Sequence, residues 1–225
     1  MAVTVLVSIG GFASAPFMER CLFEPEAILR YRQYHRLITS GFLHANWPHL
    51  AVNMFSFYSF GGSIESLIGP STLLVVYFSS ILGGNLLSLL LHRNHAYRAL
   101  GASGGVCGVV FASIFLIPGS SVYLFPVPVP IPASIFAVLF IVISFFGIQS
   151  RRGNIGHDAH LGGAVIGLLV TTLLHPVIIA ESPILWMTVV ALSVALFIYL
   201  HVNSRRRSAR LHVVQNEDDG RKRWP

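Results

Sequence analysis

The chain has 225 residues, of which 54% are hydrophobic and only 11% are charged, and its formal net charge is +6. A soluble domain carries about 25% charged residues, so this composition excludes an ordinary water-soluble globular protein. The basic residues lie between apolar stretches and form no single patch, which favours a membrane protein over a nucleic-acid-binding one. The length fits an all-α, polytopic membrane helix bundle with six or seven spans of about 20 residues each.

Seven apolar stretches are predicted to span the membrane. The first, residues 1–17, is similar to a signal peptide but has no basic residue before its apolar core, so we interpret it as a short, retained span. The segment 18–48 mixes charges with aromatic residues and is expected to lie in the membrane interface. The other six predicted spans are residues 49–68, 71–91, 103–117, 133–148, 160–174 and 184–200.

Two further segments are predicted not to be helical. Proline occupies every second position from residue 126 to residue 132. Because proline fixes φ and removes an N–H donor, we expect this loop to be extended and interpret it as a stiff connector. The charged tail, residues 204–225, is predicted to be disordered.

Polar side chains inside the predicted spans are the strongest functional signal, because an unpartnered polar group is costly within a bilayer. His49 and Asn53 are spaced i, i+4, so both lie on one face of the second span. Taken alone, this pair is better explained by hydrogen bonds that hold two helices together.

A glycine-rich run, Gly101-Ala102-Ser103-Gly104-Gly105, lies where the loop after the third span enters the fourth. Glycines permit a tight turn and a close approach of substrate. The run also places Ser103 at a helix N-terminus, where free N–H groups and the helix dipole favour a negative charge such as an oxyanion. The alternative explanation is that small residues simply pack two spans together.

A polar run, Gly156-His157-Asp158-Ala159-His160, lies at the start of the sixth predicted span, and Gly163 and Gly167 follow. Glycines four residues apart form a smooth stripe that permits close contact with another helix. If that helix is the fourth span, a histidine on the stripe comes within reach of Ser103. A neutral imidazole is the usual base that activates a serine hydroxyl, so the three polar groups together predict a serine hydrolase.

Over about residues 34–175, the sequence resembles the rhomboid intramembrane proteases. Four motifs carry the resemblance, in the family's order. They are His49-x-x-x-Asn53, similar to the oxyanion pair; Gly61-Gly62-x-x-Glu65, similar to a structural motif; Gly101-x-Ser103-Gly104, similar to the nucleophile motif; and Ala159-His160-x-x-Gly163-x-x-x-Gly167, similar to the base motif.

By this resemblance, Ser103 is the nucleophile and His160 the base of a dyad that has no aspartate. His49, Asn53 and the Ser103 backbone N–H are implied to bind the oxyanion. Asp158 is not expected to join the dyad, because a residue two positions before His160 points elsewhere on a helix.

His157 is a rival base, but only His160 keeps register with Gly163 and Gly167. Two positions depart from the family pattern. His35-Arg36 replaces a Trp-Arg pair, which keeps the charge and weakens the aromatic anchor. Cys107 stands where family members often have a tyrosine that stacks on the catalytic histidine. Cys107 and Cys21 suggest no disulfide framework or zinc site.

The resemblance implies an intramembrane serine endopeptidase that cleaves transmembrane substrate proteins through an acyl-enzyme. It implies a catalytic core over residues 1–180 and a location in the bacterial inner membrane. The apolar stretch that follows the core predicts an extra transmembrane helix over residues 181–203. No cofactor, metal or nucleic-acid partner is implied, and no H-E-x-x-H motif occurs. One alternative is an inactive relative that binds membrane segments. The other is a transporter or haem-binding bundle with His49 and His160 as ligands.

The orientation in the membrane has two conflicting predictions. With seven spans, all 15 lysines and arginines lie on one side, together with the tail and the loops around Ser103 and His160. The positive-inside rule makes this side cytoplasmic. Resemblance to bacterial rhomboids implies the reverse, with the active site opening outward.

Overall fold

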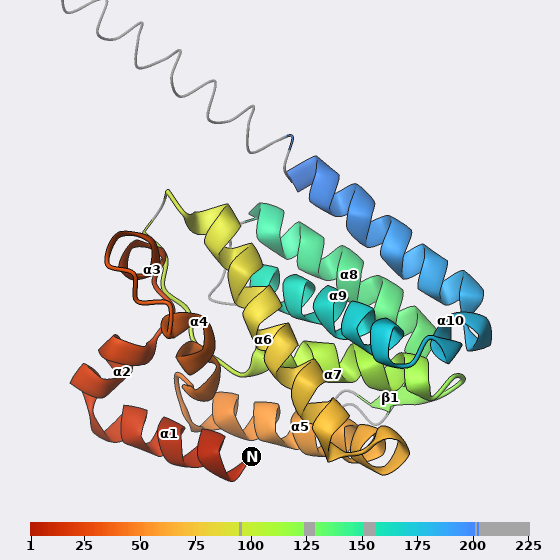
Figure 1. The fold of residues 1–225 in the computed structure, drawn as a ribbon, viewed down its shortest axis with the longest axis horizontal. Helices are drawn as coiled ribbons and strands as arrows, with labels where there is room; N and C mark the ends of the chain where they lie inside the picture. Colours follow the sequence, from red (N-terminus) through yellow and green to blue (C-terminus); the bar gives the residue numbers. More distant parts are fainter. Residues whose placement is uncertain (95, 124–128, 151–155, 201, 203–225) are drawn as a thin grey trace, which may run out of the picture.

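Long apolar helices dominate the computed structural model, which describes residues 1–94, 96–123, 129–150, 156–200 and 202. Within these residues, four helices are long and apolar enough to cross a membrane: α6 (Pro70–His92), α8 (Ala133–Ser150), α9 (His157–Leu174) and Pro183–Leu200. α5 (Trp47–Ile68) has similar length but is more polar. These helices confirm an all-α membrane bundle (Figure 1), and their bounds agree with the predicted spans within three residues. The total of seven spans stays a prediction, and the predicted disordered tail lies outside the described residues.

The first predicted span is interrupted. α1 (Ala2–Ala13) has 12 residues, which corresponds to about 18 Å and is shorter than the roughly 30 Å hydrocarbon core. Ser14 is extended, and its side chain accepts a hydrogen bond from the Phe17 N–H at the start of α2 (Ala15–Cys21). Pro16 has no N–H and could not continue the hydrogen bonding of α1. The structure therefore divides the apolar stretch 1–17 between two helices, and the short first span stays a prediction.

Short helices follow in the segment that was predicted to be interfacial: α3 (Pro25–Arg30), α4 (Arg36–Thr39) and the 3-10 helix η1 (Ser40–Phe42). Arg36 is buried, and its guanidinium donates to the carbonyls of Glu19 and Leu22 at 2.9 and 2.7 Å. Arg98, in the loop before α7, forms ion pairs with Glu19 and Glu24. These contacts fasten the segment to the loop that leads to α7.

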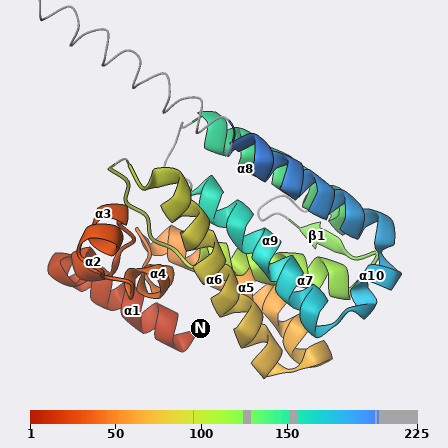
Figure 2. The ribbon, with the colours of Figure 1, turned by 45° about the horizontal axis from the view of Figure 1, so that its top comes forward.

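α7 (Ser103–Leu116) lies at the centre of the bundle, with α5, α6 and α9 packed around it (Figures 1 and 2). Nearly all of its residues are buried. Gly163 and Gly167 of α9 lie directly against the backbone of Gly104 and Gly108 of α7, and a side chain on either α9 glycine would collide with it. The glycine stripe therefore brings α9 into backbone contact with α7.

The helix Pro183–Leu200 runs along α8 (Figures 1 and 2). Its Trp186 Nε1 donates to Thr172 Oγ1 of α9 at 2.9 Å, and the Tyr199 ring lies 5.4 Å from the ring of Phe145 on α8. Phe145 is near the end of α8, two residues before Gly147, against which His157 of α9 packs. The C-terminal end of the helix Pro183–Leu200 thus lies on the same side of the bundle as the start of α9.

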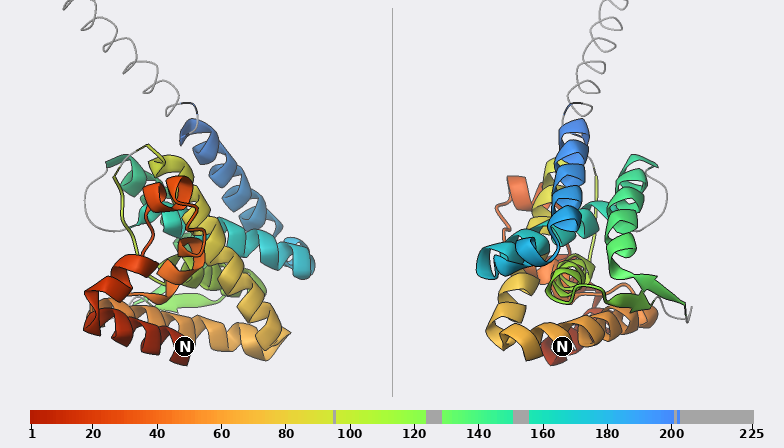
Figure 3. Two further views of the ribbon diagram at one scale, coloured as in Figure 1. Left: turned by 60° about the vertical axis from the view of Figure 1, so that its left-hand side comes forward. Right: turned by 90° about the vertical axis from the view of Figure 1, so that its right-hand side faces the viewer.

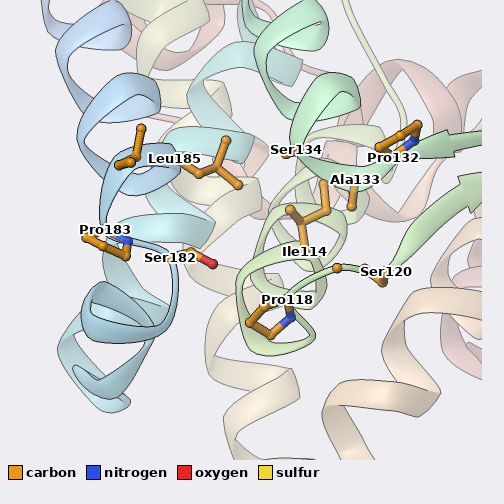
Figure 4. A pocket seen from close by; sticks show the side chains of 11 residues that line it. Ile114, Pro118, Ser120, Pro132, Ala133, Ser134, Ser182, Pro183 and Leu185 are labelled. Carbon is orange, nitrogen blue, oxygen red and sulfur yellow. The ribbon is translucent and has the colours of Figure 1, made fainter.

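A small hairpin connects α7 with α8. Its strands, β1 (Ser121–Tyr123) and β2 (Pro130–Pro132), pair antiparallel, so this part of the proline-rich segment is extended as predicted, while residues 124–128 lie outside the described residues. A pocket of about 320 Å³ lies beside the hairpin, between the end of α7 and the start of the last helix (Figure 4). It is at the opposite end of α7 from Ser103.

Candidate active site

Ser103 is the first residue of α7, and His160 lies in the first turn of α9. His160 Nε2 is 2.7 Å from Ser103 Oγ, although the two residues are 57 positions apart in the sequence. At this distance an imidazole can accept the proton of the serine hydroxyl. The structure thus brings the nucleophile and the base expected from the sequence into hydrogen-bond contact.

The neighbours of His160 make other contacts. The His157 ring packs against Gly147 of α8, and its centroid is 6.3 Å from that of the His160 ring. Asp158 contacts residues of α6 and of the loop before α7. Cys107, one turn after Ser103, packs against the hydrophobic core. His160, and not its rival His157, is the histidine that the structure places at Ser103.

The backbone before Ser103 turns at Gly101, whose φ of +138° is a conformation that favours glycine. A Cβ built on Gly101 would lie 3.1 Å from His49 Nε2 and 3.6 Å from Ser103 Oγ, so both groups border the same space. His49 Nδ1 accepts a long hydrogen bond of 3.5 Å from the Ala45 N–H. The proton of a neutral His49 ring therefore lies on Nε2, where it can be donated beside Ser103.

Asn53 lies one turn after His49 on α5 and is buried. Its Nδ2 donates to the His49 carbonyl at 2.9 Å. An amide carries two N–H donors, and this bond occupies one of them. Because α5 packs against α7, Asn53 lies on the helix that borders the nucleophile.

His44, in the loop before α5, is a fully buried residue that the sequence interpretation missed. Its Nε2 accepts from the Ala102 N–H at 3.4 Å, and its Nδ1 lies 2.9 Å from Ser8 Oγ. Ser8 in turn donates to the Phe42 carbonyl at 2.9 Å. Since Nε2 accepts, a neutral His44 carries its proton on Nδ1 and donates it to Ser8. This chain of bonds ties the residue before the nucleophile to α1, which lies beside α5 (Figure 3).

Burial and the neighbouring His49 lower the pKa of His44 to about 4, so its ring is neutral at pH 7. A neutral ring is what the hydrogen bonds require, because an imidazolium could not accept from Ala102. The two histidine rings meet edge to face, with centroids 4.9 Å apart. His44 lies outside the predicted spans, so a search for polar residues within spans does not reach it.

A protein-family model matches the part of the chain that forms this site. The model of the Rhomboid domain matches residues 31–177, more than half of the chain. The chain belongs to the rhomboid family. The matched range contains Ser103, His160, His49 and Asn53, whereas α1 and the helix Pro183–Leu200 lie outside it.

Curated relatives are found in mitochondria and in bacteria. This rhomboid is 34% identical to RHOMBOID-like protein 12, mitochondrial, of Arabidopsis thaliana over 154 residues, which are 60% of this chain and 45% of the relative. It is 34% identical over 137 residues to Rhomboid protein 1, mitochondrial, of Saccharomyces cerevisiae, covering 59% and 40%. It is 29% identical over 144 residues to Rhomboid protease GlpG of Yersinia pseudotuberculosis, covering 63% and 48%. The chain thus spans less than half the length of these relatives.

The haem-binding alternative makes different demands on the same histidines. Axial ligation would use a ring nitrogen of His49 and of His160. His160 Nε2 is already in contact with Ser103 Oγ. This contact favours proton transfer over ligation for His160.

Proposed function

We propose that this rhomboid is an intramembrane serine endopeptidase that cleaves transmembrane substrate proteins with a Ser103–His160 dyad. The observation that carries the proposal is the 2.7 Å contact between His160 Nε2 and Ser103 Oγ at the N-terminus of α7. A serine hydroxyl is a poor nucleophile until a base takes its proton, and this contact supplies the base. Similarity to Rhomboid protease GlpG, a protease by name, points the same way.

The proposed reaction assigns a step to each of these groups. Ser103 Oγ attacks the scissile carbonyl carbon while its proton moves to His160 Nε2. The resulting oxyanion accepts hydrogen bonds from His49 Nε2–H, the second amide N–H of Asn53 and the Ser103 N–H. His160 then gives its proton to the leaving amine, which leaves an acyl-enzyme on Ser103. Water, deprotonated by His160, hydrolyses the ester and restores the hydroxyl.

His44 has a supporting role in this proposal. It touches neither the hydroxyl nor the base, but it accepts the N–H of Ala102, the residue that precedes Ser103. It thereby holds the turn that presents the Ser103 N–H. We therefore propose that α1, through Ser8, belongs to the catalytic core over residues 1–180. Within residues 181–203, we propose that the helix Pro183–Leu200 is an additional transmembrane helix.

The names of the relatives bear on which cellular membrane contains this protein. The apolar helices make the chain an integral membrane protein. The two relatives at 34% identity are mitochondrial by name, so the comparisons do not support the bacterial inner membrane expected from the sequence.

The experiment that tests the proposal combines a model transmembrane substrate with a fluorophosphonate probe of serine nucleophiles. We expect the wild-type protein to cleave the substrate and to be labelled. Ser103→Ala should lose both, and His160→Ala should lose cleavage while its thermal stability stays near wild type. His157→Ala serves as the matched control and should stay active.

Two outcomes would change the proposal. A wild-type protein that binds the membrane segment, but neither cleaves it nor reacts with the probe, would be the inactive alternative. An inactive His157→Ala beside an active His160→Ala would move the role of base to His157.

A further inference from the structure

Asp158 is a nearly fully buried residue in the first turn of α9, two residues before His160, and it is only 4% exposed. A carboxylate taken out of water needs compensating partners. Its partners come from two other segments. His92 Nε2 is 3.1 Å from Asp158 Oδ2, and the Tyr97 hydroxyl donates to Asp158 Oδ1 at 3.3 Å.

The two partners also contact each other. The rings of His92 and Tyr97 are stacked, with centroids 3.7 Å apart and an angle of 3° between their planes. His92 is the last residue of α6, and Tyr97 lies in the loop that leads to Ser103. Burial and the negative charge of Asp158 raise the pKa of Tyr97, so its hydroxyl stays protonated and can donate.

Asp158 therefore joins three segments at one point: the end of α6, the loop before the nucleophile and the first turn of the helix that carries the base. We infer that Asp158 is a positioning residue that, with His92 and Tyr97, holds His160 against Ser103. The inference rests on the proposed protease function. It goes beyond the dyad, because the carboxylate touches neither reacting atom and acts through the placement of α9.

The position of the first turn of α9 determines the contact between His160 and Ser103. His160 and Asp158 share one helical turn, so a shift of that turn relative to the loop changes the 2.7 Å contact between His160 Nε2 and Ser103 Oγ directly. A misplacement of about 1 Å between reacting groups can cost about 10²-fold in rate. The N-cap of α9 also adjoins the loop, since a Cβ built on Gly156 would lie 3.6 Å from the Tyr97 hydroxyl.

Two simpler roles for Asp158 make different predictions. An acidic residue in the first turn stabilises a helix through its dipole, and that role needs no partner from another segment. A purely structural ion pair would stabilise the fold and leave the turnover of folded enzyme unchanged. A positioning residue lowers the rate of the chemical step in enzyme that is still folded.

Three substitutions separate these roles. Tyr97→Phe keeps the stacked ring and removes only the hydroxyl, and His92→Phe keeps a ring and removes Nε2. Asp158→Asn keeps the shape of the side chain and removes its charge. The matched control is Glu26→Gln, which removes an exposed carboxylate from its pair with Arg30 on α3. For each variant we would measure the rate of fluorophosphonate labelling, kcat and KM for a transmembrane substrate, and the thermal unfolding midpoint.

We expect Asp158→Asn to lower kcat and the labelling rate by about 10- to 10²-fold, with KM little changed. Tyr97→Phe should lower the same two rates by a smaller factor. The double variant of these two should lose no more than Asp158→Asn alone, because both changes break one contact network. Glu26→Gln should match wild type.

The inference would be overturned if the probe labelled Asp158→Asn and Tyr97→Phe at the wild-type rate. It would also be overturned if the activity of these variants fell only in proportion to the amount of folded protein. If Asp158→Asn does not fold, Tyr97→Phe and His92→Phe provide the test. Wild-type labelling rates and kcat in both of these variants would overturn the inference. A wild-type protein that the probe does not label would refute the proposed protease function itself, whatever the variants do.

Discussion

Replacing Gly163 with alanine tests whether the backbone contact between α7 and α9 sets the geometry of the dyad. A Cβ on Gly163 would lie 2.7 Å from the carbonyl carbon of Gly104 and 2.9 Å from its Cα, whereas ordinary van der Waals contact begins at 3.4 Å. These are backbone atoms, which cannot rotate away as a side chain can. The two helices would have to separate by roughly 1 Å, because closely packed interiors have no spare room.

That separation acts directly on the site. His160 lies one turn before Gly163 on the same helix, so a shift of roughly 1 Å would lengthen its 2.7 Å contact with Ser103 beyond hydrogen-bond range. Misplacing reacting groups by this amount costs about 10²-fold in rate. Overpacking by one methyl group costs only about 1–3 kcal/mol of stability. We therefore expect Gly163→Ala to lose about 10²-fold in kcat while a folded population persists.

The assay compares cleavage of a transmembrane substrate with thermal unfolding in the same detergent. Gly62→Ala on α5 is the matched control, because a Cβ there would have nothing within 4 Å. It should keep wild-type turnover. A stable Gly163→Ala enzyme with wild-type kcat would refute the reasoning, and so would an equal loss in Gly62→Ala.

Two further predictions concern side chains near the nucleophile. Asn53→Ala should lower kcat by about 10²–10³ with little change in KM, and full turnover in a substrate-cleavage assay would show that Asn53 only packs. The pKa of His44 falls from its ordinary 6.5 to about 4 on folding, so between these values the unfolded chain binds the proton and the folded chain does not. Above pH 6.5 the ring is neutral in both the folded and the unfolded chain, so it does not reduce stability. As the pH falls from 6.5 toward 4, the free energy of unfolding decreases by ~3 kcal/mol in total. Thermal unfolding from pH 4 to 7 should show this slope in wild type and a shallower one in His44→Gln; identical slopes would contradict the assignment.

The positions of the helices could be read from the sequence because they are local properties. A segment that crosses a bilayer must be apolar and must satisfy its own backbone hydrogen bonds, so a continuous apolar run marks a helix. The end of a helix is marked by residues such as Gly69, which separates α5 from α6 and has a φ of +86°. The break between α1 and α2 could not be read in this way, because residues 1–17 are apolar on both sides of Ser14. Composition does not distinguish one helix from two.

The candidate site was predicted from residues that are costly in a membrane and from the family motifs. Ser103, His160, His49 and Asn53 are visible in this way because each is a polar side chain within an apolar run. The structure adds the contact of the first two and the position of the His49 ring over Gly101. The chemical roles of all four remain predictions that the proposed experiments test.

The partners of the buried polar groups were decided by the tertiary structure alone. His44 bonds Ser8 and Ala102 across 36 and 58 positions of sequence, and Asp158 reaches Tyr97 across 61. The sequence shows that a buried carboxylate or imidazole needs a partner, since leaving it unpaired is costly. It does not show which residue fills that need, because the choice depends on how closely α7 and α9 approach and on which loop ends meet there.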